Sequence, residues 1–205
     1  MTSGQLIWKT LVDAFTNGVE LLTVNILWLL FTILIIPAPA AAAGLFYTTH
    51  VMASGRAVTW QHFFEGFRKY WKVGLVWLLT NLVVVALISG SFFFYASLAE
   101  EGYRWLQAAT GLILVGWLFI QIYTFPLLLE QETPSLRVAM RNSIVFYIRM
   151  PGYSLGLALF ISGIVYLSFL LRLPWVLVTA SLCTFLSSRF TLYMLSVLTG
   201  RKLEI

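Results

Sequence analysis

Residues 36–72 read IPAPAAAAGLFYTTHVMASGRAVTWQHFFEGFRKYWK and form the longest departure from a chain that is otherwise mostly apolar. The apolar run before this stretch is interrupted by Pro37 and Pro39, which four alanines and Gly44 follow. The next apolar run begins at Val73. Between the two runs the sequence is amphipathic, basic and aromatic, so it separates two apolar segments and carries the polar chemistry between them.

The composition is that of a membrane protein. Hydrophobic residues make up 60% of the chain and charged residues 10%, whereas a soluble domain carries about 25% charge. A soluble 205-residue domain could not hide this much apolar surface, so lipid must solvate much of it. We therefore expect one integral membrane domain over residues 1–205. The single cysteine, Cys183, excludes a disulfide within the chain and a thiolate metal cage, and no cofactor is expected.

The apolar runs predict five transmembrane segments. All should be helices, because only a helix satisfies every backbone group within one segment in lipid. Residues 5–19 and the two basic loops have the pattern of short amphipathic helices lying on the bilayer. The expected fold class is thus an all-α polytopic membrane bundle of five spans plus short interfacial helices. The expected spans are 19–36, 73–99, 105–129, 151–171 and 173–200.

The positions of the basic residues predict the orientation, because loops on the cytoplasmic side are enriched in Lys and Arg. With five spans, one face holds only Lys9, Arg104 and Arg172. The other face holds nine: Arg56, Arg68, Lys69, Lys72, Arg137, Arg141, Arg149, Arg201 and Lys202. This distribution predicts a bacterial cytoplasmic membrane protein with its N-terminus outside and its C-terminus inside. The net charge of +5 thus reflects membrane topology, and nucleic acid is not expected as a partner.

The two inner loops combine aromatic and basic residues at helical spacing. Either they dock a partner at the inner face, or they anchor the protein at anionic headgroups, where each basic residue gains about 1 kcal/mol. The residues predicted to make this contact are Trp60, Phe63, Phe67, Arg68, Lys69, Arg137 and Arg141.

Arg189 is the one basic residue inside a predicted span. Counting residues from the inner ends of the spans places Arg189 at about the depth of Asn81 and Gln121, to within one helical turn. The amide oxygens could then accept hydrogen bonds from the guanidinium, forming an intramembrane polar cluster. Alternatively, Arg189 extends to lipid phosphate, and Asn81 and Gln121 simply join neighbouring helices.

No catalytic or metal site is predicted. The sequence from Gly152 to Gly156 matches G-x-S-x-G, but that hydrolase motif needs a preceding strand. Gly152, Gly156 and Gly163 are expected instead to be a helix-packing face. His50 and His62 have no cysteine or carboxylate cluster at ligand spacing. The chain is therefore expected not to be an enzyme.

The layout resembles the YesL-like family of bacterial membrane proteins, a domain of unknown function. The resemblance rests on residues 25–28 (Asn-Ile-Leu-Trp), Pro37 through Gly44, Tyr47, Gly55-Arg56 and the aromatic stretch 60–71. It implies a non-enzymatic accessory role in carbohydrate uptake or utilisation, with a sugar transporter complex or the protein's own oligomer as partner. The alternative is a small-molecule transporter or channel in its own right. The order of spans and the second basic loop fit the same family.

Overall fold

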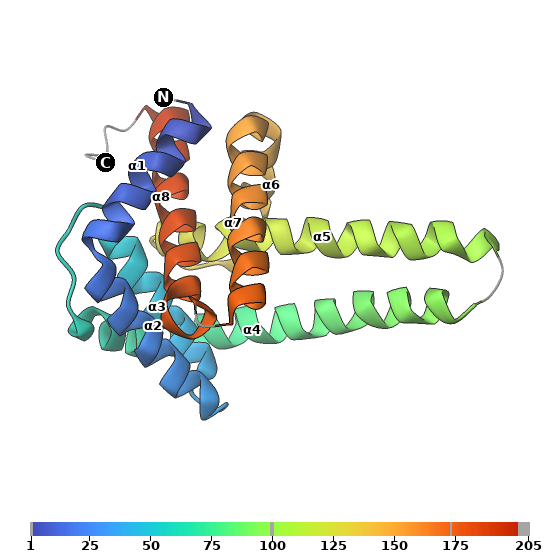
Figure 1. The fold of residues 1–205 in the computed structure, drawn as a ribbon, viewed down its shortest axis with the longest axis horizontal. Helices are drawn as coiled ribbons and strands as arrows, with labels where there is room; N and C mark the ends of the chain where they lie inside the picture. The colour runs from blue at the N-terminus through green and yellow to red at the C-terminus, as the bar shows by residue number, and fades with distance from the viewer. Residues whose placement is uncertain (1, 99–100, 173, 201–205) are drawn as a thin grey trace.

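The computed structural model describes residues 2–98, 101–172 and 174–200, and over these residues the protein is all-α (Figure 1). Four residues named in the predictions lie outside the described residues: Ala99 and Leu173, each at one end of a predicted span, and the basic residues Arg201 and Lys202. The helices, in order, are α1 (Ser3–Thr16), α2 (Gly18–Ile33), α3 (Ala38–Ala53), α4 (Trp60–Ser97), α5 (Glu101–Leu129), α6 (Leu136–Arg149), α7 (Pro151–Leu171), the π-helix η1 (Trp175–Thr179) and α8 (Ala180–Thr199).

The predicted fold class, an all-α polytopic helical bundle, is confirmed. Within the described residues, four helices are long and apolar enough to cross a membrane: α4, α5, α7 and the segment Leu177–Thr199. A fifth crossing exists only if α1 and α2 form one span, and these two helices bend by 81° at their junction. The first predicted span, 19–36, is therefore not a straight membrane helix.

Helix α3 occupies part of the stretch that the sequence suggested was a long loop. Alanine has the highest helix propensity, and Pro39 lies in the first turn, where proline is tolerated. Most of α3 is buried, including Ala41, Ala43 and Leu45. The sequence left the conformation around Pro37–Gly44 open, because a buried helix of small residues has no amphipathic period to reveal it.

Helices α3 and α4 pack closely and antiparallel through glycines. A Cβ at Gly74 would lie 2.5 Å from the carbonyl oxygen of Pro39, and one at Gly44 would lie 2.7 Å from that of Phe63. A Cβ at Gly66 would overlap the side chain of Tyr47. Small residues at these positions let the two backbones approach, so the stretch around residues 36–72 is the packed centre of the molecule.

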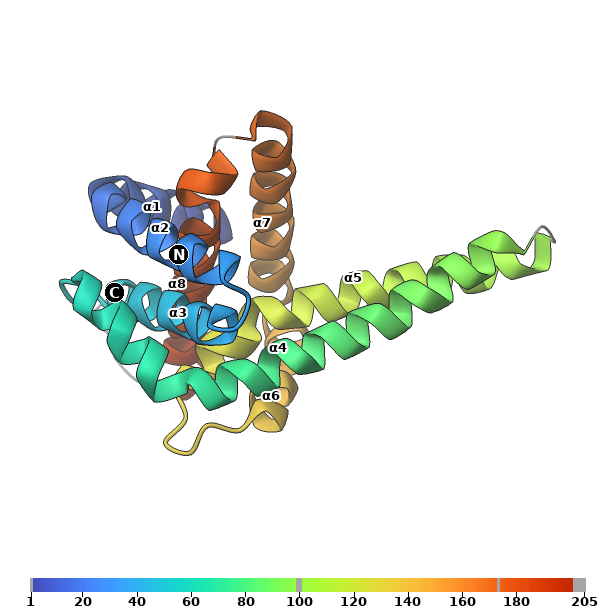
Figure 2. The same cartoon turned by 90° about the horizontal axis from the view of Figure 1, so that it is seen from below.

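Helices α4 and α5 form a long hairpin that projects from the rest of the protein, as Figures 1 and 2 show. The sequence predicted an amphipathic helix followed by a separate span over 73–99, but α4 is one continuous helix of 38 residues. In both views the hairpin runs at a steep angle to α7 and α8. The hairpin is therefore a distinct element whose apolar sides the rest of the chain does not cover.

The N-terminal helix α1 packs on α7 and α8. Leu6, Thr10 and Ala14 are buried on that side, whereas Trp8 and Phe15 are 71% and 91% exposed. Exposed aromatics opposite a packed face are typical of a helix at the membrane interface.

Candidate functional site

Arg189 lies in a buried ionic site formed by three helices. Its Nη2 donates a hydrogen bond to Oδ2 of Asp13 on α1 at 2.6 Å, and its Nη1 donates to the carbonyl of Ala53 at 2.7 Å. Arg189 is 5% exposed, and the Asp13 side chain is 34% exposed. The site is thus closed around the guanidinium and open to the surface on the carboxylate side.

The Ala53 carbonyl is a suitable partner for a cation. Ala53 is the last residue of α3, so its carbonyl oxygen has no partner within the helix and lies at the negative end of the helix dipole. A buried charge needs compensation of this kind, because an unpaired one costs several kcal/mol. The structure supplies it with one carboxylate and one helix C-terminus.

The predicted cluster of Asn81, Gln121 and Arg189 was wrong in its third member. Ser187 donates a hydrogen bond to the carbonyl of Ile122, so that side of α8 contacts α5. Arg189 is two residues further along and therefore lies on nearly the opposite side of α8, away from Gln121. A count of depth along each span does not fix which side of a helix a residue occupies.

Asn81 and Gln121 do meet, as part of a polar network inside the α4–α5 hairpin. Asn81 Nδ2 donates to Gln121 Oε1 at 3.3 Å, and Trp77 Nε1 donates to the same oxygen at 2.9 Å. Trp117 Nε1 donates to Asn81 Oδ1 at 3.0 Å. These hydrogen bonds join α4 to α5 within an apolar environment. Joining neighbouring helices is the alternative role that the sequence suggested for the two amides.

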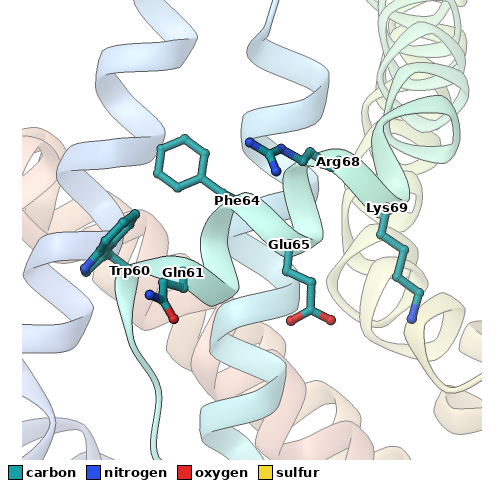
Figure 3. Close-up of a pocket in the computed structure, with 6 residues that line it drawn as sticks. All are labelled: Trp60, Gln61, Phe64, Glu65, Arg68 and Lys69. Carbon is teal, nitrogen blue, oxygen red and sulfur yellow. The ribbon is translucent and has the colours of Figure 1, made fainter.

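An aromatic and basic surface lies on the first turns of α4, and we call it the α4 face (Figure 3). It surrounds a shallow pocket of about 730 Å³. Trp60 is 58% exposed, and Trp71, further along α4, is 48% exposed. The residues that line it are Trp60, Gln61, Phe64, Glu65, Arg68 and Lys69.

One acidic residue on the α4 face is held in place from α3. The Tyr47 hydroxyl donates a hydrogen bond to Glu65 Oε1 at 2.6 Å. Burial, together with this contact to Glu65, raises the pKa of Tyr47 to about 12, so the hydroxyl keeps its proton at neutral pH. Glu65 thus stays on the α3 side and leaves Arg68 and Lys69 free to define the charge of the outer surface.

Two of the predicted inner-face residues are not available for contact as the sequence suggested. Phe63 is fully buried, with its ring 6.1 Å from that of Phe31 on α2. Phe67 is half-buried against the same ring at 5.3 Å. Their helical spacing with Trp60 reflected core packing rather than an outward face. Arg68, Arg137 and Arg141 are exposed as expected.

The predicted glycine packing face on α7 is present only in part. A Cβ at Gly156 would lie 3.6 Å from Oγ of Ser3, so α1 packs there. Gly152 and Gly163 are exposed, and added Cβ atoms would meet nothing within 4 Å. The close glycine contacts of this fold lie instead between α3 and α4.

Sequence reasoning missed two further polar contacts. His50 Nε2 lies 2.8 Å from Glu130 Oε1, which links the C-terminal part of α3 to the end of α5. Asn25 on α2 is buried, and its Oδ1 accepts a hydrogen bond from the backbone N–H of Ser181 at 3.0 Å. Within the described ranges, no group of three or more His, Cys, Asp or Glu residues could hold a metal ion.

Part of this arrangement is similar to a protein family. Residues 21–92, which cover most of α2, all of α3 and most of α4, match the model of a family described as "Protein of unknown function, DUF624". No curated protein matches the chain. No solved structure matches it either. The matched segment contains the close α3–α4 contact and the α4 face.

Proposed function

We propose that this protein is a non-enzymatic accessory protein of the bacterial cytoplasmic membrane, and that it docks a partner at the inner face through the α4 face. The observation that carries the proposal is the composition of that surface. Exposed indole rings beside Arg68 and Lys69 form the kind of aromatic and basic patch that interfaces favour.

The packing beneath the α4 face supports the same role. Close glycine contacts fix α4 against α3, so the exposed side chains stand on a rigid support. A rigid surface loses less conformational entropy when a partner binds. Arg137 and Arg141 are exposed on α6, and the topology prediction assigns them to the same, inner face of the membrane.

The proposed partner is a subunit of a sugar transporter complex. This part of the proposal rests on the resemblance to the YesL-like family, whose members are associated with carbohydrate uptake and utilisation. The surrounding membrane supplies a second partner, because anionic headgroups attract basic residues next to a membrane helix.

Co-purification from mild detergent tests the proposal. We expect the tagged, full-length protein to retain a transporter subunit in a fixed ratio. Recovery of the protein alone, as an oligomer that moves solute into liposomes, would overturn the accessory role and support transport by this chain itself.

The alternative, a small transporter or channel, is favoured by one specific observation. The Arg189–Asp13 pair is a buried charge site, and intramembrane charges usually mark a pathway or a binding site. Asp13 is its partly exposed member and lies in α1, which meets α2 at a sharp bend. In this case Asp13→Asn should reduce liposome uptake, whereas Arg68→Glu should not.

A further inference from the structure

The turn between α2 and α3, residues 34–37, exposes some of the most apolar side chains of the molecule. Leu34 is 61% exposed, Ile35 79% and Ile36 91%. Each of the two helices that it joins has 16 residues. Such a helix is about 24 Å long, which is shorter than the ~30 Å hydrocarbon core of a bilayer. Neither helix can therefore cross the membrane alone.

The α4–α5 hairpin defines where the membrane lies. Only 6% of the most apolar stretch of α4 is buried by protein, against 56% in α8. The protein interior accounts for much of the apolar character of α8, whereas only lipid can cover α4. The apolar part of α4 from Val73 to Ser97 is about 37 Å long, enough to cross the hydrocarbon core.

The turn lies at the point where α4 enters this apolar region. Pro39, which follows the turn, packs against Gly74 of α4. Lys72 lies just before Gly74, and the uncharged run of α4 begins at Val73. Helix α3 runs antiparallel to α4, so the residues before Pro39 lie next to the part of α4 that follows Gly74. Residues 34–36 are therefore at the level of the apolar run of α4, deeper in the membrane than Lys72.

We infer that α2 and α3 form a re-entrant hairpin, which inserts its turn among the acyl chains of the inner leaflet and returns to the same side. Both ends of the hairpin then lie on the cytoplasmic side, and so does the N-terminus. The inserted residues are apolar, and Arg68, Lys69 and Lys72 on the adjacent helix are positioned for anionic headgroups. This inference is independent of whether the α4 face docks a protein.

Two further observations agree with an inner N-terminus. Ser3 lies beside Gly156, near the start of α7, which follows the second basic loop. With α4 and α5 as crossings and the N-terminus inside, Lys9 joins the inner basic residues and Arg104 stays on the outer side. The bias toward a positive inner side is then stronger than with an outer N-terminus, which the five-span sequence prediction required.

Depth-dependent fluorescence tests the inserted turn. The experiment uses a Cys183→Ser background, in which Ile36→Cys supplies a single cysteine for an environment-sensitive dye, and the labelled protein is placed in liposomes. Ala57→Cys, on the exposed connection before α4, is the matched control. We expect lipids with quenchers on their acyl chains to quench the dye at position 36 and not at 57. Equal, weak quenching at both positions would overturn the inference.

Cysteine labelling tests the topology that follows. An impermeant maleimide should label Gly102→Cys, at the far end of the α4–α5 hairpin, in intact cells. It should label Ser3→Cys only after the inner face is opened. Labelling of both in intact cells would contradict the re-entrant hairpin, because α2 would then have to cross the membrane.

Discussion

At the scale of the residue, the most informative contacts of this protein are those in which a polar side chain in apolar surroundings bonds to a specific partner. Arg189 illustrates this, because a guanidinium offers five donors and no acceptor, and its burial requires oxygens. The carboxylate of Asp13 and the carbonyl of Ala53 provide them from two other helices. One side chain thus ties α1, α3 and α8 together.

Removal of the carboxylate should be costly because it leaves the guanidinium buried and incompletely compensated. For Asp13→Ala we expect a loss of about 2 kcal/mol in unfolding free energy, below the 3–5 kcal/mol of a fully buried pair, because Asp13 is partly exposed. Unfolding by SDS in mixed micelles provides the measurement.

The double variant Asp13→Ala/Arg189→Met is the control. It removes both charges, so it should be more stable than Asp13→Ala alone. If the single and double variants were equally unstable, the ion pair would not be what holds these helices together.

The sequence predicted one half of this polar chemistry correctly. Asn81 and Gln121 belong to adjacent spans joined by a short connection, so equal depth was enough to bring them together. Arg189 belongs to a helix with several neighbours, and its orientation depended on which of them it faced. Asp13 was overlooked because its helix was expected to lie on the bilayer surface, away from the predicted depth of Arg189.

The Asn81–Gln121 contact gives a second prediction at this scale. Gln121→Leu should remove the acceptor for Trp77 and Asn81 and weaken the α4–α5 hairpin by about 1 kcal/mol, the usual size of such bonds in membranes. Gln107→Leu, on the same helix toward the far end of the hairpin, is the matched control. SDS titrations compare the stability of the two variants. Equal losses of stability would contradict a specific contribution of the Gln121 hydrogen bonds to the hairpin.

At the scale of the element, the stretch from residue 36 to residue 72 organises the fold as a pair of helices packed through glycine and alanine. Such packing leaves no periodic pattern of apolar residues in the sequence. Helix α3 was therefore not predicted, although prolines and alanines mark its position. The apolar runs near 73–99, 105–129 and 151–171 do fall in helices long and apolar enough to cross a membrane, because a helix covered by lipid must be apolar over its whole length.

The packing of α4 on α3 can be tested by adding a single methyl group. Gly66→Ala would place a Cβ against Tyr47, and we expect it to destabilise the protein by about 1–3 kcal/mol. Gly90→Ala on the same helix, where a Cβ would meet nothing within 4 Å, is the matched control and should be neutral or slightly stabilising. Thermal unfolding in detergent would compare them, and a stable Gly66→Ala variant would contradict the close contact.

At the scale of the whole molecule, the steep angle between the α4–α5 hairpin and the α7–α8 pair distinguishes two parts (Figure 2). The hairpin lacks protein cover, whereas more than half of α8 is buried by protein. Composition alone predicted a membrane protein but treated all the apolar runs alike. Only the packing reveals which of them depend on lipid.

The α4 face lies on the first turns of α4, just before the apolar part of the α4–α5 hairpin begins. The proposed function depends on this surface being a docking site. Arg68 on this face and Arg104 near the far end of the hairpin are both exposed arginines, so they form a matched pair. The same charge reversal at each position separates a specific contact from a general effect of charge.

The most direct test is the amount of transporter subunit that co-purifies with Arg68→Glu compared with Arg104→Glu, at equal membrane insertion. If the α4 face docks the partner, Arg68→Glu should lose about tenfold or more of the partner, which corresponds to about 1.4 kcal/mol, while Arg104→Glu retains the wild-type amount. Equal recovery with both variants would contradict docking through the α4 face.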